Sequence, residues 1–316
     1  MSFPHTAHVP TSSFNETASF RFPLYPGMYL FVQISYNKRT TCNGEERQAL
    51  RKYVLLIVAA FCVYISFLTL EKSDYVESGN QYKDPVLFVH GFKGTARSFS
   101  TMIARFEERG WGERALTMNV TRTGKLLVRE EPFSSERPAL IQVIFENNRS
   151  SFDATSTALA AVMQVLKNDY GMERVKIVGH SMGGIVSVKF LQELYDPALH
   201  PVTSQLVTIG SPFNGVSGGR WFTQNHGPAV YDLMPGSPAL AKIAANHNRF
   251  PSQTDVLNIA GTGDQVTPLQ SALSLKGIVP EDQYRADVLY DKTIDHSGLH
   301  ETAAVDEKIG AFFDFK

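Results

Sequence analysis

Cysteine is almost absent from this sequence. Only two of its 316 residues are cysteine, and both, Cys42 and Cys62, lie before residue 71. The rest of the chain therefore cannot form a disulfide framework or a thiolate zinc site. A body without cysteine fits an exported protein that uses no disulfides, although many cytosolic domains also lack cysteine.

An excess of charge of either sign is missing as well. The chain has 30 basic and 31 acidic residues, and no run of five or more lysines and arginines. A nucleic-acid-binding protein needs a basic surface, so we predict that this protein does not bind nucleic acid. Because 43% of the residues are hydrophobic and 11% are aromatic, wholesale disorder is excluded.

The near-neutral charge hides an uneven distribution. Residues 1–52 carry six basic and three acidic side chains, residues 53–70 carry none, and residues 71–316 carry 24 basic and 28 acidic ones. An apolar helix over residues 53–70 would be about 27 Å long, close to the ~30 Å hydrocarbon core of a membrane. Arg47, Arg51 and Lys52 precede it. The positive-inside rule therefore predicts a single-pass transmembrane anchor with the C-terminal body outside the cell. The alternatives are a cleaved signal peptide, which would give a secreted protein, and a buried core helix.

Two segments flank this predicted anchor. Residues 1–52 mix proline, serine, threonine and aromatic residues without periodicity, so we expect a basic lead with little fixed structure. A translation start at Met28 is an alternative to Met1. Residues 71–83 are polar and are predicted to be a spacer.

The pattern changes over residues 84–316, where short apolar runs alternate with amphipathic helices. This alternation predicts an α/β fold with a mainly parallel sheet and helices on both faces. Residues 214–251 interrupt it and predict a lid or cap insertion, in which Trp221 and Phe222 either line a pocket mouth or pack the lid. The predicted strands cover residues 85–90, 114–121, 126–129, 140–146, 175–179, 206–210, 256–261 and 286–290, and the predicted helices cover residues 97–110, 152–170, 183–195 and 303–313.

The most specific motif is Gly179-His180-Ser181-Met182-Gly183, which fits the pattern G-x-S-x-G. A predicted buried strand precedes it and a predicted helix follows it. In this context the motif predicts a nucleophile elbow, a sharp turn that presents the Ser181 hydroxyl clear of the sheet. The backbone N–H of Met182, at the start of the helix, would point at a developing oxyanion. A purely structural turn is the alternative.

A second motif, His90-Gly91-Phe92-Lys93-Gly94, follows the first predicted strand of the domain. An HG pair at this place is typical of the loop that supplies the other oxyanion-hole donor, which we assign to the backbone N–H of Phe92. His90 precedes Ser181, whereas this architecture places its catalytic base last in the chain. We therefore predict that His90 braces the loop.

Serine needs a general base and a carboxylate that orients the base, in the chain order Ser, Asp or Glu, His. His296 lies on the loop before the last predicted helix and is the predicted base, with His300 as the rival. Asp264 follows a predicted strand and is the predicted orienting carboxylate, with Asp295 and Asp291 as rivals. A metal site formed by His296, His300 and Glu301 is a further alternative, although we expect no metal ion or cofactor.

Together these segments resemble the alpha/beta-hydrolase superfamily, and more closely a family of Gram-positive cell-surface alpha/beta hydrolases of unknown function. The resemblance covers about three-quarters of the chain and implies a triad of Ser181, Asp264 and His296. An N-terminal membrane segment is common in that family. Two features depart from the family pattern: HGFKG replaces the frequent HGxGG, and the lead over residues 1–52 is long. The segments that carry the resemblance are residues 85–99, 140–148, 178–184, 210–216, 264–266 and 296–301.

The sequence thus predicts a membrane-anchored serine hydrolase that cleaves a small-molecule or lipid acyl ester outside the cell. Two alternatives stay open. The same triad could serve an acyltransferase or an amidase. The chain could also be a non-catalytic surface-binding module on a hydrolase scaffold. The sequence does not predict the acyl-chain length or the oligomeric state.

Overall fold

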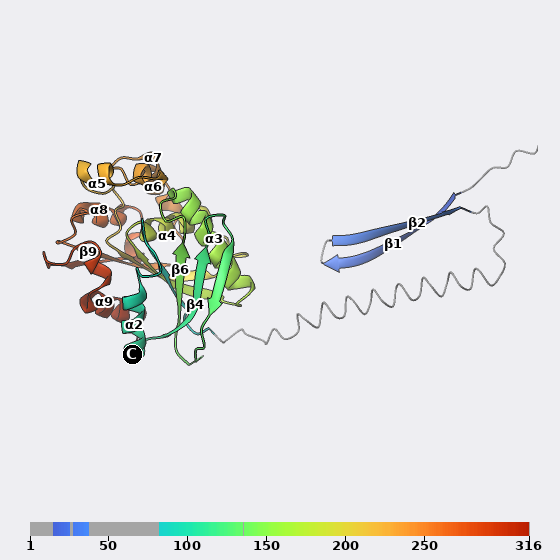
Figure 1. The fold of residues 1–316 in the computed structure, drawn as a ribbon, viewed down its shortest axis with the longest axis horizontal. Coiled ribbons are helices and arrows are strands. Elements are labelled where there is room, and N and C mark those ends of the chain that lie inside the picture. Colours follow the sequence, from blue (N-terminus) through green and yellow to red (C-terminus); the bar gives the residue numbers. More distant parts are fainter. Residues whose placement is uncertain (1–14, 26–27, 38–81, 135, 316) are drawn as a thin grey trace, which may run out of the picture. The chain divides into compact units, whose positions relative to one another are not determined.

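The computed structural model describes residues 15–25, 28–37, 82–134 and 136–315 (Figure 1). The chain divides into two compact units, Met1–Val76 and Glu77–Lys316. The predicted anchor over residues 53–70 and most of the predicted spacer lie outside the described residues. Among the residues that are described, no helix is long and apolar enough to span a membrane.

The first unit contains a two-stranded antiparallel hairpin. Strand β1 (Asn15–Tyr25) pairs with β2 (Met28–Asn37), so that Asn15 faces Asn37. These strands lie in the lead for which the sequence analysis expected little fixed structure. Both runs are rich in aromatic and aliphatic residues, and Pro26-Gly27 separates them. Aromatic and β-branched residues favour strands, which accounts for the pairing of these two runs.

The second unit is built on an eight-stranded sheet with the order β10-β9-β8-β7-β3-β6-β4-β5. All neighbouring strands are parallel except β4 and β5, which are antiparallel. The prediction of a mainly parallel α/β sheet is confirmed. The strands are β3 (Val86–Val89), β4 (Glu113–Val120), β5 (Leu126–Glu130), β6 (Ala139–Phe145), β7 (Arg174–His180), β8 (Val202–Ile209), β9 (Asp255–Gly261) and β10 (Tyr284–Leu289).

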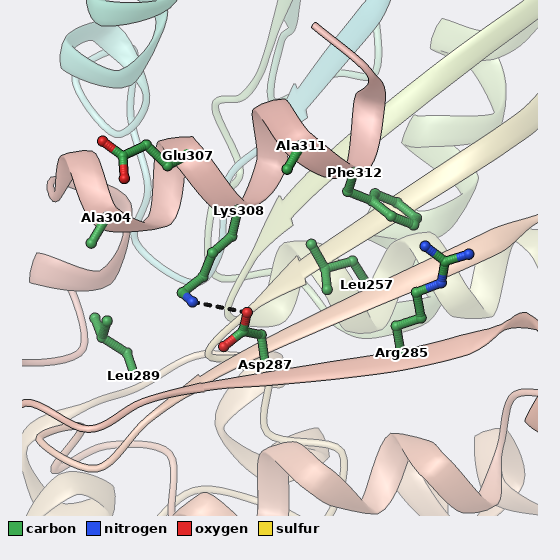
Figure 2. Close-up of a pocket in the computed structure, with 9 residues that line it drawn as sticks. All are labelled: Leu257, Arg285, Asp287, Leu289, Ala304, Glu307, Lys308, Ala311 and Phe312. Carbon is green, nitrogen blue, oxygen red and sulfur yellow. Dashed lines mark hydrogen bonds and ion pairs between the residues drawn. The ribbon is translucent and has the colours of Figure 1, made fainter.

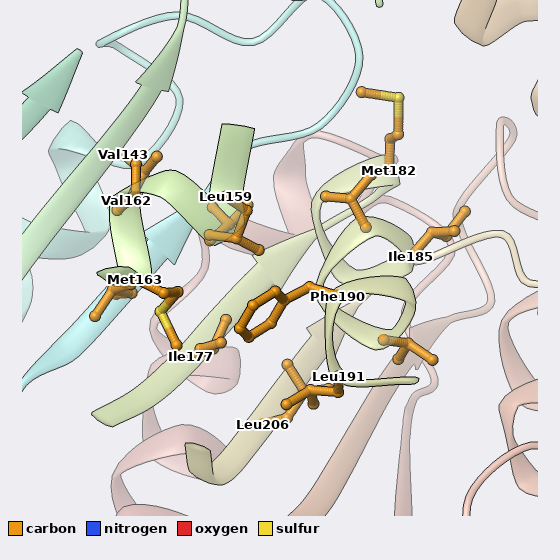
Figure 3. Packing of buried hydrophobic residues seen from close by; sticks show 14 of the residues in the cluster. Val143, Leu159, Val162, Met163, Ile177, Met182, Ile185, Phe190, Leu191 and Leu206 are labelled. Carbon is orange, nitrogen blue, oxygen red and sulfur yellow. The ribbon is translucent and has the colours of Figure 1, made fainter. Parts of the chain in front are cut away.

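Helices cover both faces of this sheet, and the alternation of side chains along the strands explains why. In β3, Leu87 and Val89 belong to the core formed with helices α3 and α4. Figure 3 shows part of this core, with Leu159 and Met163 of α3, Ile177 of β7 and Phe190 of α4. Val86 and Phe88 belong to the opposite core, formed with α2 and α9. Successive strand residues point to opposite faces, so a fully apolar strand needs a helix layer on each side. The helices are α2 (Ser100–Glu108), α3 (Phe152–Asn168), α4 (Met182–Glu193), α8 (Leu269–Leu273) and α9 (Ala303–Phe313).

The segment between β8 and β9 departs from the strand–helix alternation. Figure 1 shows its three short helices gathered at one end of the unit. They are α5 (Gly219–Gln224), α6 (Pro228–Asp232) and α7 (Pro238–Ala245). The Glu193 carboxylate accepts hydrogen bonds from Lys189 of α4 and from Lys242 of α7, at 2.8 and 2.7 Å. The pair between Lys242 and Glu193 attaches α7 to α4.

Candidate active site

Ser181 occupies the sharp turn between β7 and α4. Its backbone has φ 56° and ψ −126°, a conformation that residues other than glycine rarely adopt. Its N–H donates a hydrogen bond of 2.8 Å to the carbonyl of Ile209 at the end of the neighbouring strand β8. Such strain persists only where the surrounding structure enforces it. The predicted strand–turn–helix context of the G-x-S-x-G motif is therefore present.

Two glycines permit this turn. A Cβ atom on Gly183 would lie 2.1 Å from the carbonyl oxygen of Val89. A Cβ atom on Gly91 would lie 2.7 Å from the Cβ of Ser181 and 3.1 Å from the backbone nitrogen of Met182. The loop after β3 and the turn after β7 thus pack backbone against backbone, which any larger residue would prevent.

His296 lies between Ser181 and Asp264. Its Nδ1 is 2.7 Å from Asp264 Oδ2, and its Nε2 is 2.9 Å from Ser181 Oγ. A carboxylate only accepts hydrogen bonds, so Nδ1 carries the proton of the neutral ring. The lone pair of Nε2 then faces the hydroxyl of Ser181. In this tautomer the imidazole can take the proton of the serine.

Asp264 is held by its own loop. Its Oδ1 accepts hydrogen bonds from the backbone N–H groups of Val266 and Thr267, at 2.8 and 2.7 Å. The other oxygen, Oδ2, faces His296. The side chain of Asp264 is 2% exposed and that of His296 is 15% exposed. Water therefore competes little for this hydrogen bond, which strengthens it.

The rival residues point elsewhere. His300 is buried in a 3₁₀ turn (Gly298–His300) before α9, and its ring packs on Phe99. Asp295 accepts a hydrogen bond from the backbone of Gly298, and Asp291 accepts two from Thr293. None of the three has a contact with Ser181 that would replace His296 or Asp264.

The metal alternative fails on the same geometry. Both ring nitrogens of His296 already face Asp264 and Ser181. In the part of the chain that the structure describes, no three His, Cys, Asp or Glu side chains form a group that could hold a metal ion.

The two predicted oxyanion donors are the backbone N–H groups of Phe92 and Met182. Gly91 brings the loop after β3 against Met182, as the close approach above shows. Neither amide donates a hydrogen bond to another described residue. Met182 is the first residue of α4, whose N-terminus attracts negative charge. Neither amide is therefore engaged by another described residue, and their role as oxyanion donors stays a prediction.

His90 has the neighbours of a structural residue. Its Nδ1 donates to the carbonyl of Gly91 at 2.9 Å, and its Nε2 accepts from the N–H of Phe145 at 3.0 Å. Burial lowers the pKa of His90, although the Gly91 carbonyl opposes this. Both ring nitrogens of His90 therefore make hydrogen bonds to the backbone, and His90 holds the loop after β3 against the end of β6.

The insertion contacts the loop after β3 through the side chains of Trp221 and Asn225. Phe92 packs on Trp221 of α5, with ring centroids 5.5 Å apart. The Lys93 ammonium donates to the side chain of Asn225 at 2.9 Å. The guanidinium of Arg149, in the segment between β6 and α3, lies over the Phe92 ring, 5.4 Å from its centroid. Trp221 thus packs both inside the insertion, on Phe222, and against the loop that carries Phe92.

A separate groove of about 500 Å³ lies between α9 and strands β9 and β10 (Figure 2). Arg285 and Phe312 line it, and an ion pair of 2.8 Å between Lys308 and Asp287 crosses it. None of the three residues Ser181, Asp264 and His296 lines this groove.

Comparison with protein families identifies the fold. A family described as alpha/beta hydrolase of unknown function (DUF915) matches residues 73–315. The chain belongs to this family. Comparison with the curated proteins found no match. The resemblance inferred from the motifs is therefore confirmed at the level of the family, which itself carries no assigned substrate.

Two solved structures illustrate the likeness of this DUF915 chain to known proteins. A gene product of Listeria innocua is 27% identical, with a TM-score of 0.63, and the match covers 74% of this chain and 95% of that one. A protein of Lactobacillus plantarum, described as a candidate cell surface hydrolase, is 20% identical with a TM-score of 0.56; the match covers 74% of this chain and 90% of that one.

Sequence reasoning did not assign a role to His180. The residue is named in the G-x-S-x-G motif, yet only the structure shows that its ring contacts the loop of His296. The signal in the sequence was a histidine at the end of a buried strand, where a polar side chain needs a partner.

Proposed function

We propose that this DUF915 member is a serine hydrolase that cleaves carboxylic esters through Ser181, His296 and Asp264. The observation that carries the proposal is the continuous hydrogen-bonded series Asp264–His296–Ser181, with links of 2.7 and 2.9 Å. The tautomer that Asp264 imposes on His296 is the one that a general base for serine requires. The strained turn at Ser181 adds a second, independent indication.

The reaction follows from this geometry. Ser181 Oγ attacks the carbonyl carbon of the ester while His296 Nε2 takes the hydroxyl proton. The carbonyl oxygen gains negative charge and accepts hydrogen bonds from the N–H groups of Phe92 and Met182. When the tetrahedral intermediate collapses, the alcohol leaves with the proton from His296, and the acyl group stays on Ser181.

Water completes the cycle by the same steps. His296 removes a proton from a water molecule, which attacks the acyl carbon. The bond from that carbon to Ser181 Oγ then breaks, Oγ takes the proton back from His296, and the carboxylic acid leaves. During both halves His296 is transiently an imidazolium ion. The buried carboxylate of Asp264 stabilises that cation, and its two loop amides keep it oriented.

The substrate would be a small-molecule or lipid acyl ester that enters under the insertion. Phe92 joins the candidate oxyanion donor to the insertion, because its ring packs on Trp221. An acyl chain bound beside Ser181 would therefore meet aromatic side chains first. An acyl transfer to an alcohol, or cleavage of an amide, would use the same residues, and analysis of products with water and alcohol acceptors separates these outcomes.

We further propose that the enzyme acts at the outer face of a membrane, anchored by residues 53–70. Support comes from the uncharged run and the basic residues Arg47, Arg51 and Lys52 before it. The description of the Lactobacillus plantarum structure as a candidate cell surface hydrolase agrees with this location.

The proposed activity is tested with the full chain in detergent and a series of p-nitrophenyl esters of graded acyl length. We expect hydrolysis by the wild type and a loss of at least about 10³-fold in Ser181→Ala, since removal of a triad member has effects of this order. Gln224→Asn, at an exposed position of the insertion, is a control for expression and folding. Equal hydrolysis by wild type and Ser181→Ala would refute the proposal. A folded wild type that hydrolyses none of the esters would instead favour a non-catalytic binding module.

A further inference from the structure

We propose that His180 is a positioning residue that holds the catalytic base His296 in place through the backbone carbonyl of His296. The inference rests on the proposed serine hydrolase function and assigns a role to a side chain outside the triad.

The position of His180 follows from the sheet. It is the last residue of β7, directly before Ser181. Val178, two residues earlier, belongs to the core with α2 and α9. Because alternate strand residues share a face, His180 also points to that side. The loop before α9 lies there and carries His296 and His300.

The contact that carries the inference joins the ring of His180 to the loop. His180 Nε2 lies 3.0 Å from the carbonyl oxygen of His296. A carbonyl only accepts hydrogen bonds, so Nε2 of His180 carries the proton and donates. Two consecutive residues therefore hold the two ends of His296: His180 holds its backbone and Ser181 faces its ring.

The surroundings of His180 prevent it from moving away. Its ring centroid lies 4.7 Å from that of His296 and 4.4 Å from that of His300. The ring of His300 packs in turn on Phe99. The carbonyl of His300 accepts a hydrogen bond of 3.1 Å from Arg105 of α2. The packing of His300, Phe99 and Arg105 thus restricts the ring of His180, which in turn holds the backbone of His296. Close packing transmits such constraints.

The charge of His180 suits this role. Burial, followed by the neighbouring His296 and His300, lowers the pKa of His180 well below its ordinary value. His180 therefore stays neutral when His296 becomes an imidazolium 4.7 Å away. The other titratable groups on this side are His90, Glu301, Arg105 and Asp306. Of these, Glu301 Oε1 is 3.0 Å from His300 Nδ1, so its charge faces His300.

The consequence for catalysis concerns the 2.9 Å distance between His296 and Ser181. Without the donor on His180, the loop of His296 loses one attachment, and the imidazole can shift from the hydroxyl. A misplacement of about 1 Å at a reacting group costs on the order of 10²-fold in rate. The substrate-binding surfaces are not touched, so kcat should fall while KM changes little.

The experiment compares His180→Phe, His180→Gln and His180→Asn in the full-length protein. Phenylalanine fills the space without a donor. Glutamine places an amide N–H near the position of Nε2, whereas asparagine is one methylene shorter and cannot reach. The matched control is His200→Phe, because His200 is equally buried but accepts a hydrogen bond from Asp196 beyond the end of α4.

The measurements are kcat and KM on a p-nitrophenyl ester, the rate of fluorophosphonate labelling, and the melting temperature. In His180→Phe and His180→Asn we expect kcat and the labelling rate to fall roughly 10–100-fold, with KM within about twofold of the wild-type value. In His180→Gln we expect kcat to recover to within about fivefold of wild type. In His200→Phe we expect no loss of kcat per folded molecule. If His180→Phe does not fold, His180→Asn against His180→Gln gives the same comparison.

Two results would overturn the inference: wild-type kcat in a folded variant without the donor, or an equal loss of kcat in His180→Gln and His180→Asn. A wild-type protein that neither labels nor hydrolyses esters would instead refute the proposed function, and the two failures are thus distinguishable.

Discussion

The imidazole of His296 lies 2.9 Å from the hydroxyl of Ser181, although 115 positions separate the two residues in the chain. Ser181 follows β7, Asp264 follows β9 and His296 follows β10. These strands are parallel, so their carboxyl ends meet at one edge of the sheet, where open α/β sheets bind their ligands. The topology alone therefore gathers the three loops.

Asp264→Asn tests how the base is oriented. If the amide oxygen keeps the hydrogen bonds from Val266 and Thr267, the amide nitrogen must face His296 Nδ1. The ring then adopts the other tautomer, with the proton on Nε2, and cannot accept from Ser181. We expect kcat to fall by about 10³–10⁴-fold with an unchanged fold. The measurement is ester hydrolysis together with circular dichroism, and a loss below about tenfold would assign the orienting role to another acid.

Gly183→Ala tests the packing under the turn. The new Cβ would lie 2.1 Å from the carbonyl oxygen of Val89, so strand and helix must separate. We expect the free energy of unfolding to fall by about 2–3 kcal/mol, measured by urea denaturation. Gly219→Ala is the matched control, because a Cβ there has no atom within 4 Å. Equal stability of the two variants would contradict the packing described here.

The buried histidines predict how stability depends on pH. Burial lowers the pKa of His90, His180, His200 and His300. The unfolded chain takes up protons on these rings near pH 6.5, whereas the folded protein does so only at lower pH. The free energy of unfolding should therefore fall as the pH drops below 6.5, by up to about 1.4 kcal/mol per pH unit for each proton.

Urea denaturation at pH 7.5, 6.5 and 5.5 measures this slope. His200→Phe removes one of the four rings and should reduce it. His226→Gln, at an exposed position, should leave it unchanged. A free energy of unfolding that is constant between pH 7.5 and 5.5 would contradict the burial of these rings in the neutral form.

The proposed anchor predicts how a shortened chain behaves. A fragment that begins at Asp84 keeps nearly all of the second compact unit and lacks residues 53–70. We expect it to stay in the supernatant after ultracentrifugation without detergent, while the full chain sediments with membranes. Sedimentation of both with membranes would exclude residues 53–70 as the sole attachment.

The sequence was sufficient for the sheet and for the three residues that meet at its edge. Apolar strands with helical runs between them leave few topologies, and the expected chain order of serine, acid and histidine favoured Ser181, Asp264 and His296 over the rivals His300, Asp295 and Asp291. The choice between His296 and His300 was harder. The two residues are four positions apart, and the conformation of the loop decides which imidazole ring faces Ser181.

Other features depend on distant contacts. The hydrogen bond from His180 to the carbonyl of His296 joins the end of β7 to a loop 116 residues later in the chain and has no local signature. The pairing of β1 with β2 was not predicted, because the lead mixes proline and polar residues with its aromatic runs and shows no periodicity.

Labelling by a fluorophosphonate probe tests the central claim most directly, since the probe reacts with an activated serine and requires no knowledge of the substrate. The account predicts that the wild-type chain is labelled, that mass spectrometry finds the adduct on Ser181, and that Ser181→Ala is not labelled. Labelling of Ser181→Ala at the wild-type rate, or an adduct on another residue, would contradict it.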